Sequence, residues 1–213
     1  MKNQDMMKTG TTTMGIICKD GVVLAADKRA TAGNMICSGY IEKIVQISDD
    51  MAVTIAGTVS DAQLTIKLIK AETALKTIRT GQTITVSETA NLLAQMLYNN
   101  VRRMSMIPGI THFLLSGRDK EGIHLYDIFV DGSLTKIRDF TSTGSGSVFA
   151  YGVLETLYEK SMTVEEGVKL ALKSVNAALQ RDSASGNGID IVTITNKGVK
   201  KVLEKEIKTR IEV

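Results

Sequence analysis

The order in which hydrophobic patterns change along the chain constrains its fold more than any other feature. Two apolar runs, at 12–18 and 22–26, flank Lys19-Asp20-Gly21. Asp-Gly between apolar runs indicates a β-hairpin, because glycine accepts the positive φ of a tight turn. Two more strand patterns follow at 44–47 and 52–56. The first part of the chain is therefore predicted to form mainly antiparallel strands.

A pair of helices is predicted after these strands. From residue 60 to residue 80, apolar side chains recur at helical spacing, and Gly81 ends the run. The recurring side chains are Leu64, Leu68, Ala71 and Leu75. A second helix is predicted at 86–104, where Thr85 and Glu88 have the spacing of a capping box.

The remaining elements repeat this order. Strand patterns lie at 111–117, 123–130, 134–140, 189–195 and 199–203. Helices are predicted at 146–159 and 164–181, and Thr163 with Glu166 gives the second a capping pattern. The charged stretch 204–213 is expected to be a short helix or a tail. Hairpin sheets with two helix pairs indicate one α+β domain, with sheets inside and helices outside.

Composition argues against several classes of function. The 213 residues are 43% hydrophobic and 23% charged, which is typical of a globular domain. The net charge is only +3 and the basic residues are scattered, so no nucleic-acid partner is expected. No apolar run reaches about 20 residues, and residues 1–10 lack the apolar segment of a secretory signal. The sequence therefore predicts a cytoplasmic protein without a membrane partner.

The cysteines and histidines do not indicate a metal centre or a cofactor. Cys18 and Cys37 lack metal-ligand spacing and are too few for a disulfide framework, so each is expected to be a buried or half-buried small side chain. His112 and His124 fall in strand patterns. We expect neither to serve a Ser-His-Asp triad or a zinc site.

Gly10-Thr11 is the first candidate for chemistry. A threonine hydroxyl is a poor nucleophile at neutral pH and needs a base within hydrogen-bond reach. Cleavage before Thr11 would give this residue its own base, a free α-amine with an ordinary pKa of about 7.7–8.0. A short threonine run by itself more often just begins a strand.

Three further features give this threonine a context. Asp27 follows one strand pattern and Lys43 precedes another, and a lysine ammonium held by an aspartate would favour a threonine alkoxide. Gly57 lies at a strand-to-helix junction, where backbone amides suit an oxyanion hole. The loops 143–147 and 181–186 are rich in serine and glycine, but neither fits a phosphate-binding pattern. Taken one at a time, Asp27 and Lys43 are typical of surface charges, Gly57 of a tight turn, and the two serine- and glycine-rich segments of ordinary loops.

Together these segments closely resemble the proteasome β-subunit family, in particular its archaeal, self-processing catalytic members. The matching segments are Gly10 to Thr13, Lys19 to Arg29, Thr54 to Gly57, Asp61 to Gln63, Thr143 to Ser147, Tyr151 to Glu155 and Gln180 to Gly186. The match covers nearly the whole chain. One departure is the segment Arg103 to His112, which is slightly longer than the family pattern.

The resemblance implies the N-terminal-nucleophile hydrolase fold, a four-layer αββα sandwich with two antiparallel sheets between helix layers. It implies that residues 1–10 are a propeptide removed by autolysis at Gly10–Thr11. Residues 11–213 are then a single catalytic domain, a threonine endopeptidase without cofactor or metal.

The resemblance also assigns roles to individual residues. Thr11 corresponds to the nucleophile, and Asp27 and Lys43 fall at the acidic and lysine positions of the family. The polar group around the terminal amine corresponds to Ser145, Asp182 and Ser185. Gly57 corresponds to the oxyanion-hole amide.

The family's specificity pocket corresponds to Ala30, Ile41, Val45, Ile55, Val59 and Gln63. This lining has no acidic or basic residue, which predicts cleavage after large apolar residues, a chymotrypsin-like preference. Thr31, with Gly57 and Val59, is expected to align the substrate backbone as an added strand.

The resemblance finally implies partners. These are other β subunits in stacked heptameric rings, the flanking α-subunit rings, a regulatory ATPase reached through the α ring, and polypeptide substrates. Two alternatives remain open from the sequence. One is a non-catalytic or unprocessed scaffold subunit of the β ring, and the other is a subunit of the bacterial two-component protease.

Overall fold

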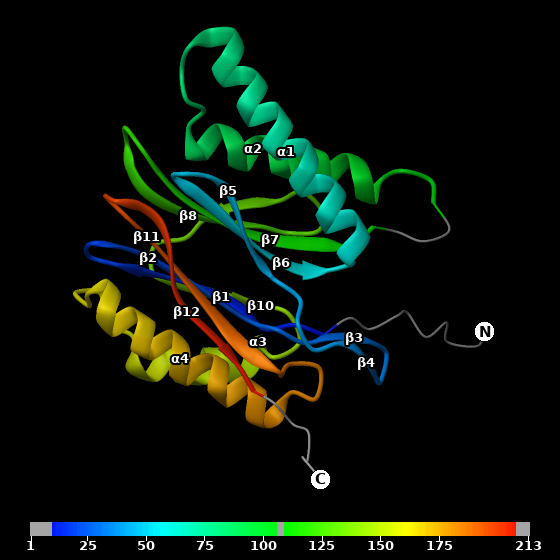
Figure 1. Ribbon diagram of the computed structural model, residues 1–213, viewed down its shortest axis with the longest axis vertical. Helices are drawn as coiled ribbons and strands as arrows, with labels where there is room; N and C mark the ends of the chain where they lie inside the picture. Colours follow the sequence, from blue (N-terminus) through cyan, green and yellow to red (C-terminus); the bar gives the residue numbers. More distant parts are fainter. Residues whose placement is uncertain (1–9, 106–108, 208–213) are drawn as a thin grey trace.

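The computed structural model describes residues 10–105 and 109–207 and arranges them in four layers. Two five-stranded sheets lie face to face, and a pair of helices covers the outer face of each (Figure 1). The helices above one sheet are α1 (Val59–Thr80) and α2 (Val86–Val101), and those below the other are α3 (Ser147–Leu157) and α4 (Val164–Arg181). The predicted αββα sandwich is confirmed.

The strands of both sheets pair antiparallel throughout. In one sheet the order is β10 (Phe140–Thr143), β1 (Thr13–Cys18), β2 (Gly21–Asp27), β11 (Gly188–Thr195) and β12 (Gly198–Glu206). In the other it is β5 (Ile44–Ser48), β6 (Met51–Gly57), β7 (Thr111–Asp119), β8 (Gly122–Ile128) and β9 (Leu134–Lys136). A small hairpin of β3 (Ala30–Ala32) and β4 (Met35–Ser38) projects beside them.

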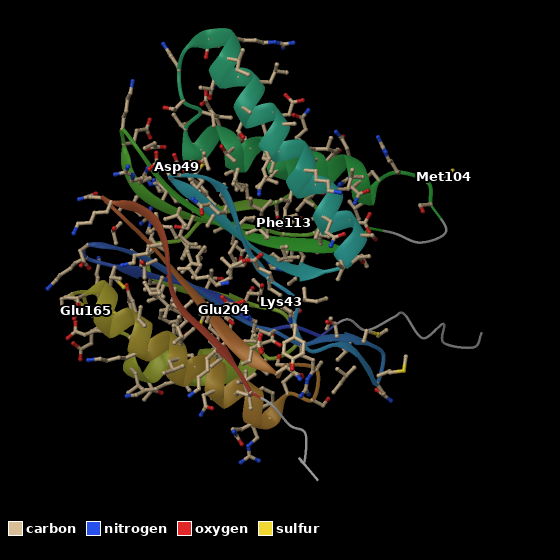
Figure 2. All side chains as sticks on the ribbon, in the orientation of Figure 1. Lys43, Asp49, Met104, Phe113, Glu165 and Glu204 are labelled. Carbon is tan, nitrogen blue, oxygen red and sulfur yellow. The ribbon has the colours of Figure 1, made fainter. Side chains whose placement is uncertain are left out.

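Three apolar cores correspond to the three spaces between layers. One lies between α1, α2 and their sheet, and contains Phe113 (Figure 2). A second lies under α3 and α4, and the third fills the space between the two sheets. Every residue of β2 is buried, because this strand has a neighbour on each side and a layer on each face. Asp27, the last residue of this apolar strand, therefore places its carboxylate in the interior of the protein.

Local signals set several element boundaries as expected. Both predicted capping boxes are present, with Thr85 and Glu88 at the start of α2 and Thr163 and Glu166 at the start of α4. In each box the threonine side chain accepts from the glutamate amide while the glutamate accepts from the threonine amide. Gly81 ends α1 with φ of 66°, the left-handed conformation that glycine favours.

The apolar stripe that predicted α1 lies on the opposite side of the helix from the core. Leu64, Leu68 and Leu75 are exposed, at 58%, 48% and 36%. The buried side of the helix is formed by Ala62, Thr65, Ile66, Ile69 and Thr73. The spacing indicated a helix correctly, but the expected core face was wrong. Thr65 and Thr73 are accommodated on the buried side because the methyl group of a threonine can pack in a core. The hydroxyl of Thr73 is satisfied within the helix, where it donates to the carbonyl of Lys70.

Other boundaries also differ from expectation. The strand expected at 134–140 is two strands, β9 and β10, in different sheets. β12 continues through residues 204–206, where a helix or tail was expected, and 208–213 lie outside the described residues. The hairpin β3–β4 was not predicted, because its exposed residues show no alternation. Cys37, in β4, is exposed rather than buried, whereas Cys18 is buried as expected.

Candidate active site

Thr11 is a buried residue, 6% exposed, immediately before β1. The register of β1 and β2 pairs Thr13 with Ala26, which brings Asp27 beside Thr12. The Thr12 amide donates to Asp27 Oδ1 over 2.9 Å, and the Asp27 amide donates to the Thr12 carbonyl over 3.1 Å. The hairpin thus fixes the position of Thr11 relative to the carboxylate at the end of the next strand.

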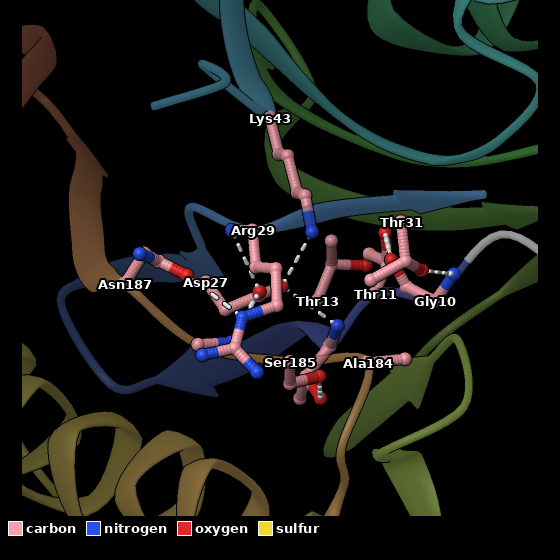
Figure 3. Close-up of polar contacts among 12 residues, drawn as sticks. Gly10, Thr11, Thr13, Asp27, Arg29, Thr31, Lys43, Ala184, Ser185 and Asn187 are labelled. Atoms are coloured by element: carbon pink, nitrogen blue, oxygen red, sulfur yellow. Dashed lines mark hydrogen bonds and ion pairs between the residues drawn. The ribbon is translucent and has the colours of Figure 1, made fainter. Parts of the chain in front are cut away.

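Asp27 and Lys43 form a buried ion pair (Figure 3). Lys43 Nζ lies 2.6 Å from Asp27 Oδ1, and the two residues are 4% and 0% exposed. The other carboxylate oxygen, Oδ2, accepts from the amides of Arg29 at 3.0 Å and Gly186 at 2.9 Å. Four donors therefore satisfy a carboxylate that burial alone would penalise.

The charge state of Lys43 reflects two opposing influences. Burial lowers the pKa of the Lys43 ammonium, and the neighbouring Asp27 carboxylate opposes this shift. The net direction is downward. Lys43 is consequently a stronger acid than an exposed lysine.

The three polar residues predicted around the amine lie together. The backbone nitrogen of Thr11 donates to Ser145 Oγ over 3.3 Å, and Ser145 donates to Asp182 Oδ2 over 2.7 Å. Ser185 donates to the same carboxylate oxygen over 2.6 Å and contacts Thr12 Oγ1 at 2.7 Å. Segments more than 130 residues apart in the sequence therefore converge on the nitrogen that cleavage would release as an amine.

The Gly10–Thr11 bond is held next to the candidate nucleophile. The Thr11 hydroxyl donates to the Gly10 carbonyl oxygen over 2.6 Å, and the Gly10 amide donates to Thr31 Oγ1 over 2.9 Å. Gly10 is buried, and a Cβ atom at this position would lie 1.7 Å from Cβ of Ala184. Only glycine fits here without displacing the neighbouring loop.

Gly57 closes the other side of the site, at the end of β6. Its φ is 111°, in the region that glycine favours, and a Cβ atom would lie 2.2 Å from the Ile110 carbonyl oxygen. The next residue, Thr58, donates its amide to that carbonyl over 2.8 Å and precedes the first turn of α1. This combination of strand end and helix start places Gly57 in the wall of the same pocket as Thr11.

That pocket contains most of the predicted specificity residues. Its lining includes Ala30, Thr31, Ile41, Ile55, Val59 and Gln63, together with Gly10, Thr11, Lys43 and Gly57. Val45 lies outside it and packs against the core under α1 and α2. Glu42 and Ala62 also line the pocket and were missed, although each is adjacent in sequence to a predicted lining residue. The lining thus includes two charged residues, Glu42 and Lys43, that were not in the expected set of specificity residues.

Two further polar residues, Arg29 and Asn187, lie next to the candidate site. Arg29 Nε donates to Asn187 Oδ1 over 2.7 Å, and Arg29 Nη1 donates to the Ser183 carbonyl over 2.8 Å (Figure 3). Sequence reasoning assigned neither residue a role. The only available signal was their position, since each lies within two residues of a candidate site residue.

The histidines lie in strands, as expected. His112, in β7, contacts Asp127 through Nε2 at 2.5 Å, and His124, in β8, lies 3.5 Å from Asp119. Across residues 10–105 and 109–207 no cluster of three or more His, Cys, Asp or Glu side chains has the arrangement of a metal site. Within the same ranges, no helix combines the length and apolar character needed to cross a bilayer.

Comparison with known proteins places the chain among archaeal sequences of one kind. A family model described as "Proteasome subunit" matches residues 7–194. The chain is 46% identical over 208 residues to a "Proteasome subunit beta" of Ferroglobus placidus, covering 98% of this chain and 97% of the relative. Proteins of the same name from Methanocaldococcus fervens and Archaeoglobus profundus are 45% and 46% identical, with 96% of this chain covered in both cases, and 89% and 93% of the respective relatives.

Proposed function

The chain belongs to the proteasome subunit family as a β-type core subunit, and from this premise we propose that it is a threonine endopeptidase with Thr11 as nucleophile. One observation carries the proposal. The Thr11 hydroxyl lies 2.6 Å from the carbonyl oxygen of the bond that must be cut, in a pocket that also includes the buried Lys43 of the Lys43–Asp27 pair. Nucleophile, charge partner and scissile bond are thus in one place.

Maturation uses the hydroxyl of Thr11 against its own leader. Oγ attacks the Gly10 carbonyl carbon, and the hydroxyl proton passes to the amide nitrogen as the carbon–nitrogen bond breaks. This gives an ester between Gly10 and Thr11 Oγ. Water then hydrolyses the ester, releasing residues 1–10 as a propeptide and leaving a free α-amine on Thr11.

Peptide cleavage by the mature chain repeats this chemistry with the amine as base. The amine, through a bound water, takes the hydroxyl proton as Oγ attacks the substrate carbonyl carbon. The Lys43 ammonium lowers the cost of negative charge on Oγ, and Asp27 orients Lys43. The amide of Gly57 stabilises the oxyanion, where loss of one donor typically costs about 10²–10³ in rate.

The amine in turn needs partners that hold its orientation. Ser145 already accepts from the Thr11 nitrogen, and Asp182 accepts from both Ser145 and Ser185. After cleavage the same three side chains can retain the amine and a water molecule beside Oγ. This arrangement is more than a plain strand residue requires, and it favours a catalytic over a scaffold subunit.

The pocket supports a preference for large apolar residues before the cut. Ala30, Ile41, Ile55 and Val59 supply an apolar lining. Glu42 also lines the pocket, but its carboxylate is largely exposed and lies 3.6 Å from Lys201, which is not among the lining residues. Thr31 also lines the pocket, and its hydroxyl already accepts from the backbone of Gly10, as it would from an added substrate strand.

The exposed stripe of α1 supports assembly with other subunits. Leu64, Leu68, Leu75 and Ile78 are all at least 36% exposed and share one side of the helix. We propose that the subunit assembles into heptameric β rings, which stack between α rings in a cytoplasmic particle. A regulatory ATPase would act on this particle through the α ring. Its substrates are unfolded polypeptides. Enclosure by rings would protect other proteins from a site that contains no element for selecting them.

Intact mass spectrometry tests the proposal. The full chain is mixed with its α partner, and its mass and its hydrolysis of an apolar fluorogenic peptide are followed together. We expect the mass of residues 1–10 to be lost as hydrolysis appears, and neither event in Thr11→Ala. Thr80→Ala, at the exposed end of α1, is the matched control and should behave as wild type. Hydrolysis by the Thr11→Ala particle would overturn the proposal.

A further inference from the structure

Asn187 has an unusual backbone conformation. Its φ is 64°, and within residues 10–105 and 109–207 it is the one residue other than glycine with a positive φ. Glycine adopts this conformation at no steric cost, whereas a residue with a Cβ atom is strained in it. Gly186 and Gly188 flank Asn187, so glycine is used freely in this turn. Asparagine tolerates this conformation better than most residues with a Cβ atom, and at 187 it also contributes a side-chain amide that glycine lacks.

That contribution is a bond to Arg29. Asn187 Oδ1 accepts from Arg29 Nε over 2.7 Å, while Arg29 Nη1 donates to the Ser183 carbonyl over 2.8 Å. The guanidinium thus connects both ends of the loop 183–187, and Figure 3 shows it beside Asn187. Bonds from a charged guanidinium are stronger than neutral ones and fix direction as well as distance.

The loop packs closely against Arg29 on one side and against Gly39 on the other. A Cβ atom on Gly186 would lie 2.3 Å from Arg29 Cζ, so the guanidinium packs directly on the loop backbone. On the other side, a Cβ atom on Gly39 would lie 2.8 Å from Asn187 Nδ2. Asn187 is therefore enclosed between Arg29 and the turn that follows β4.

The loop held in this way carries two groups of the site. The Gly186 amide donates to Asp27 Oδ2 over 2.9 Å, and Ser185 Oγ bonds Asp182 and Thr12. The Arg29 amide donates to the same Asp27 oxygen over 3.0 Å. A shift of the loop would remove a donor from the carboxylate that orients Lys43, and would move Ser185 away from the nucleophile.

We propose that Asn187 is a positioning residue, which holds Arg29 across the loop 183–187 and so keeps Ser185 and the Gly186 amide in place. The inference rests on the proposed function of Thr11. Asn187 does not line the substrate pocket, so its loss should lower kcat and leave KM unchanged.

Replacing Asn187 by glycine distinguishes the positioning role from a purely conformational role in the turn. Asn187→Gly relieves the backbone strain but removes the acceptor for Arg29. A turn role predicts unchanged or improved stability and unchanged activity. The positioning role predicts kcat lowered about tenfold, since one bond to a charged group is lost. Asn187→Asp keeps an acceptor oxygen and should restore kcat to near the wild-type value.

The experiment uses the full chain assembled with its α partner. Thermal stability, kcat and KM on an apolar peptide, and amide hydrogen exchange of residues 183–188 are measured. The variants are Asn187→Gly, Asn187→Asp, Arg29→Met and the double variant Arg29→Met/Asn187→Gly. Asn196→Gly, in the remote turn between β11 and β12, is the control. We expect Arg29→Met to lower kcat at least as much as Asn187→Gly, and the double variant to lose no more than Arg29→Met alone.

Hydrogen exchange keeps the two proposals separable. In Asn187→Gly the Gly186 amide should exchange about tenfold faster, whether or not the particle hydrolyses peptides. An inactive wild-type particle would overturn the proposed function, and the exchange rates would still decide the role of Asn187. Wild-type kcat together with wild-type exchange in Asn187→Gly would overturn the positioning role.

Discussion

Gly10 and Ala184 approach so closely that a Cβ atom on Gly10 would lie 1.7 Å from Cβ of Ala184. The residue before the scissile bond is thus packed against the loop that carries Ser185. Gly10 and the loop fit each other only if one of the two positions has no side chain. If Gly10 is the last residue of a leader, as proposed, it is constrained by the folded domain as well as by the chemistry of cleavage.

Gly10→Ala is expected to slow maturation. The added methyl group must displace either the leader or the loop 183–187, and both hold groups needed for attack. The uncleaved chain should accumulate in a time course of intact mass after assembly. Ala184→Gly makes room for the methyl group, so the double variant should recover most of the processing rate. No recovery would show that steric contact is not the cause.

Lys43→Met is expected to abolish hydrolysis and to lower the free energy of unfolding by about 3 kcal/mol or more, because Asp27 is left buried without its ion-pair partner. Chemical denaturation and a peptide assay measure the two effects. Lys173→Met, on the exposed side of α4, is the matched control and should change neither. Retention of activity in Lys43→Met would contradict the role given to the pair.

Glu42→Gln is expected to alter specificity without altering the chemistry. Glu42 is the acidic residue among the described residues that line the pocket, and its carboxylate is largely exposed, 3.6 Å from Lys201 Nζ. Its removal should reduce residual cleavage after lysine or arginine about threefold, the scale of a partly exposed charge interaction. Cleavage after leucine should be unchanged. Comparison of kcat/KM on two peptides that differ in this one residue measures the effect, and equal losses on both would refute it.

Glu88 is expected to stabilise the fold in a pH-dependent manner. Its bond to Lys76 and the Thr85 amide lower the pKa of Glu88 from 4.5 to about 2. Because the folded-state pKa is depressed, the stabilisation is present above about pH 4.5 and is lost as the pH falls towards 2. Urea unfolding should show wild type more stable than Glu88→Gln by about 0.5 kcal/mol at pH 7. The difference should shrink by pH 3, and a constant difference would exclude this origin.

The elements that sequence predicted best are those with local causes. The capping residues Thr85 and Thr163 depend on neighbours a few residues away, and both were placed correctly. The hairpin after Cys18 also formed, but Gly21 begins β2 without the positive φ that was expected of it. The buried face of α1 was predicted wrongly. Periodicity shows that apolar residues share one face of a helix, but not whether that face points to the core or to solvent. Leu64 and Leu68 form the exposed stripe, yet Ile66 and Ile69 face the sheet.

The site illustrates the same limit. Thr11, Asp27 and Lys43 were candidates from their chemistry and their places beside strand patterns, but only the resemblance joined them in one site, because no local rule links residues separated by turns and strands. Glu42 was missed since a pocket wall is a property of the assembled backbone. Asn187 was missed because its left-handed conformation and its bond to Arg29 exist only after folding.

The central claim is that the amine released on Thr11 is the base for its own hydroxyl. The most direct test compares two assembled particles, one whose chain begins at Thr11 and one with a single extra residue before it, with mass spectrometry confirming that the extension remains. The account predicts full activity for the first and a loss in kcat of about a hundredfold or more for the second. Equal kcat for the two particles would contradict it.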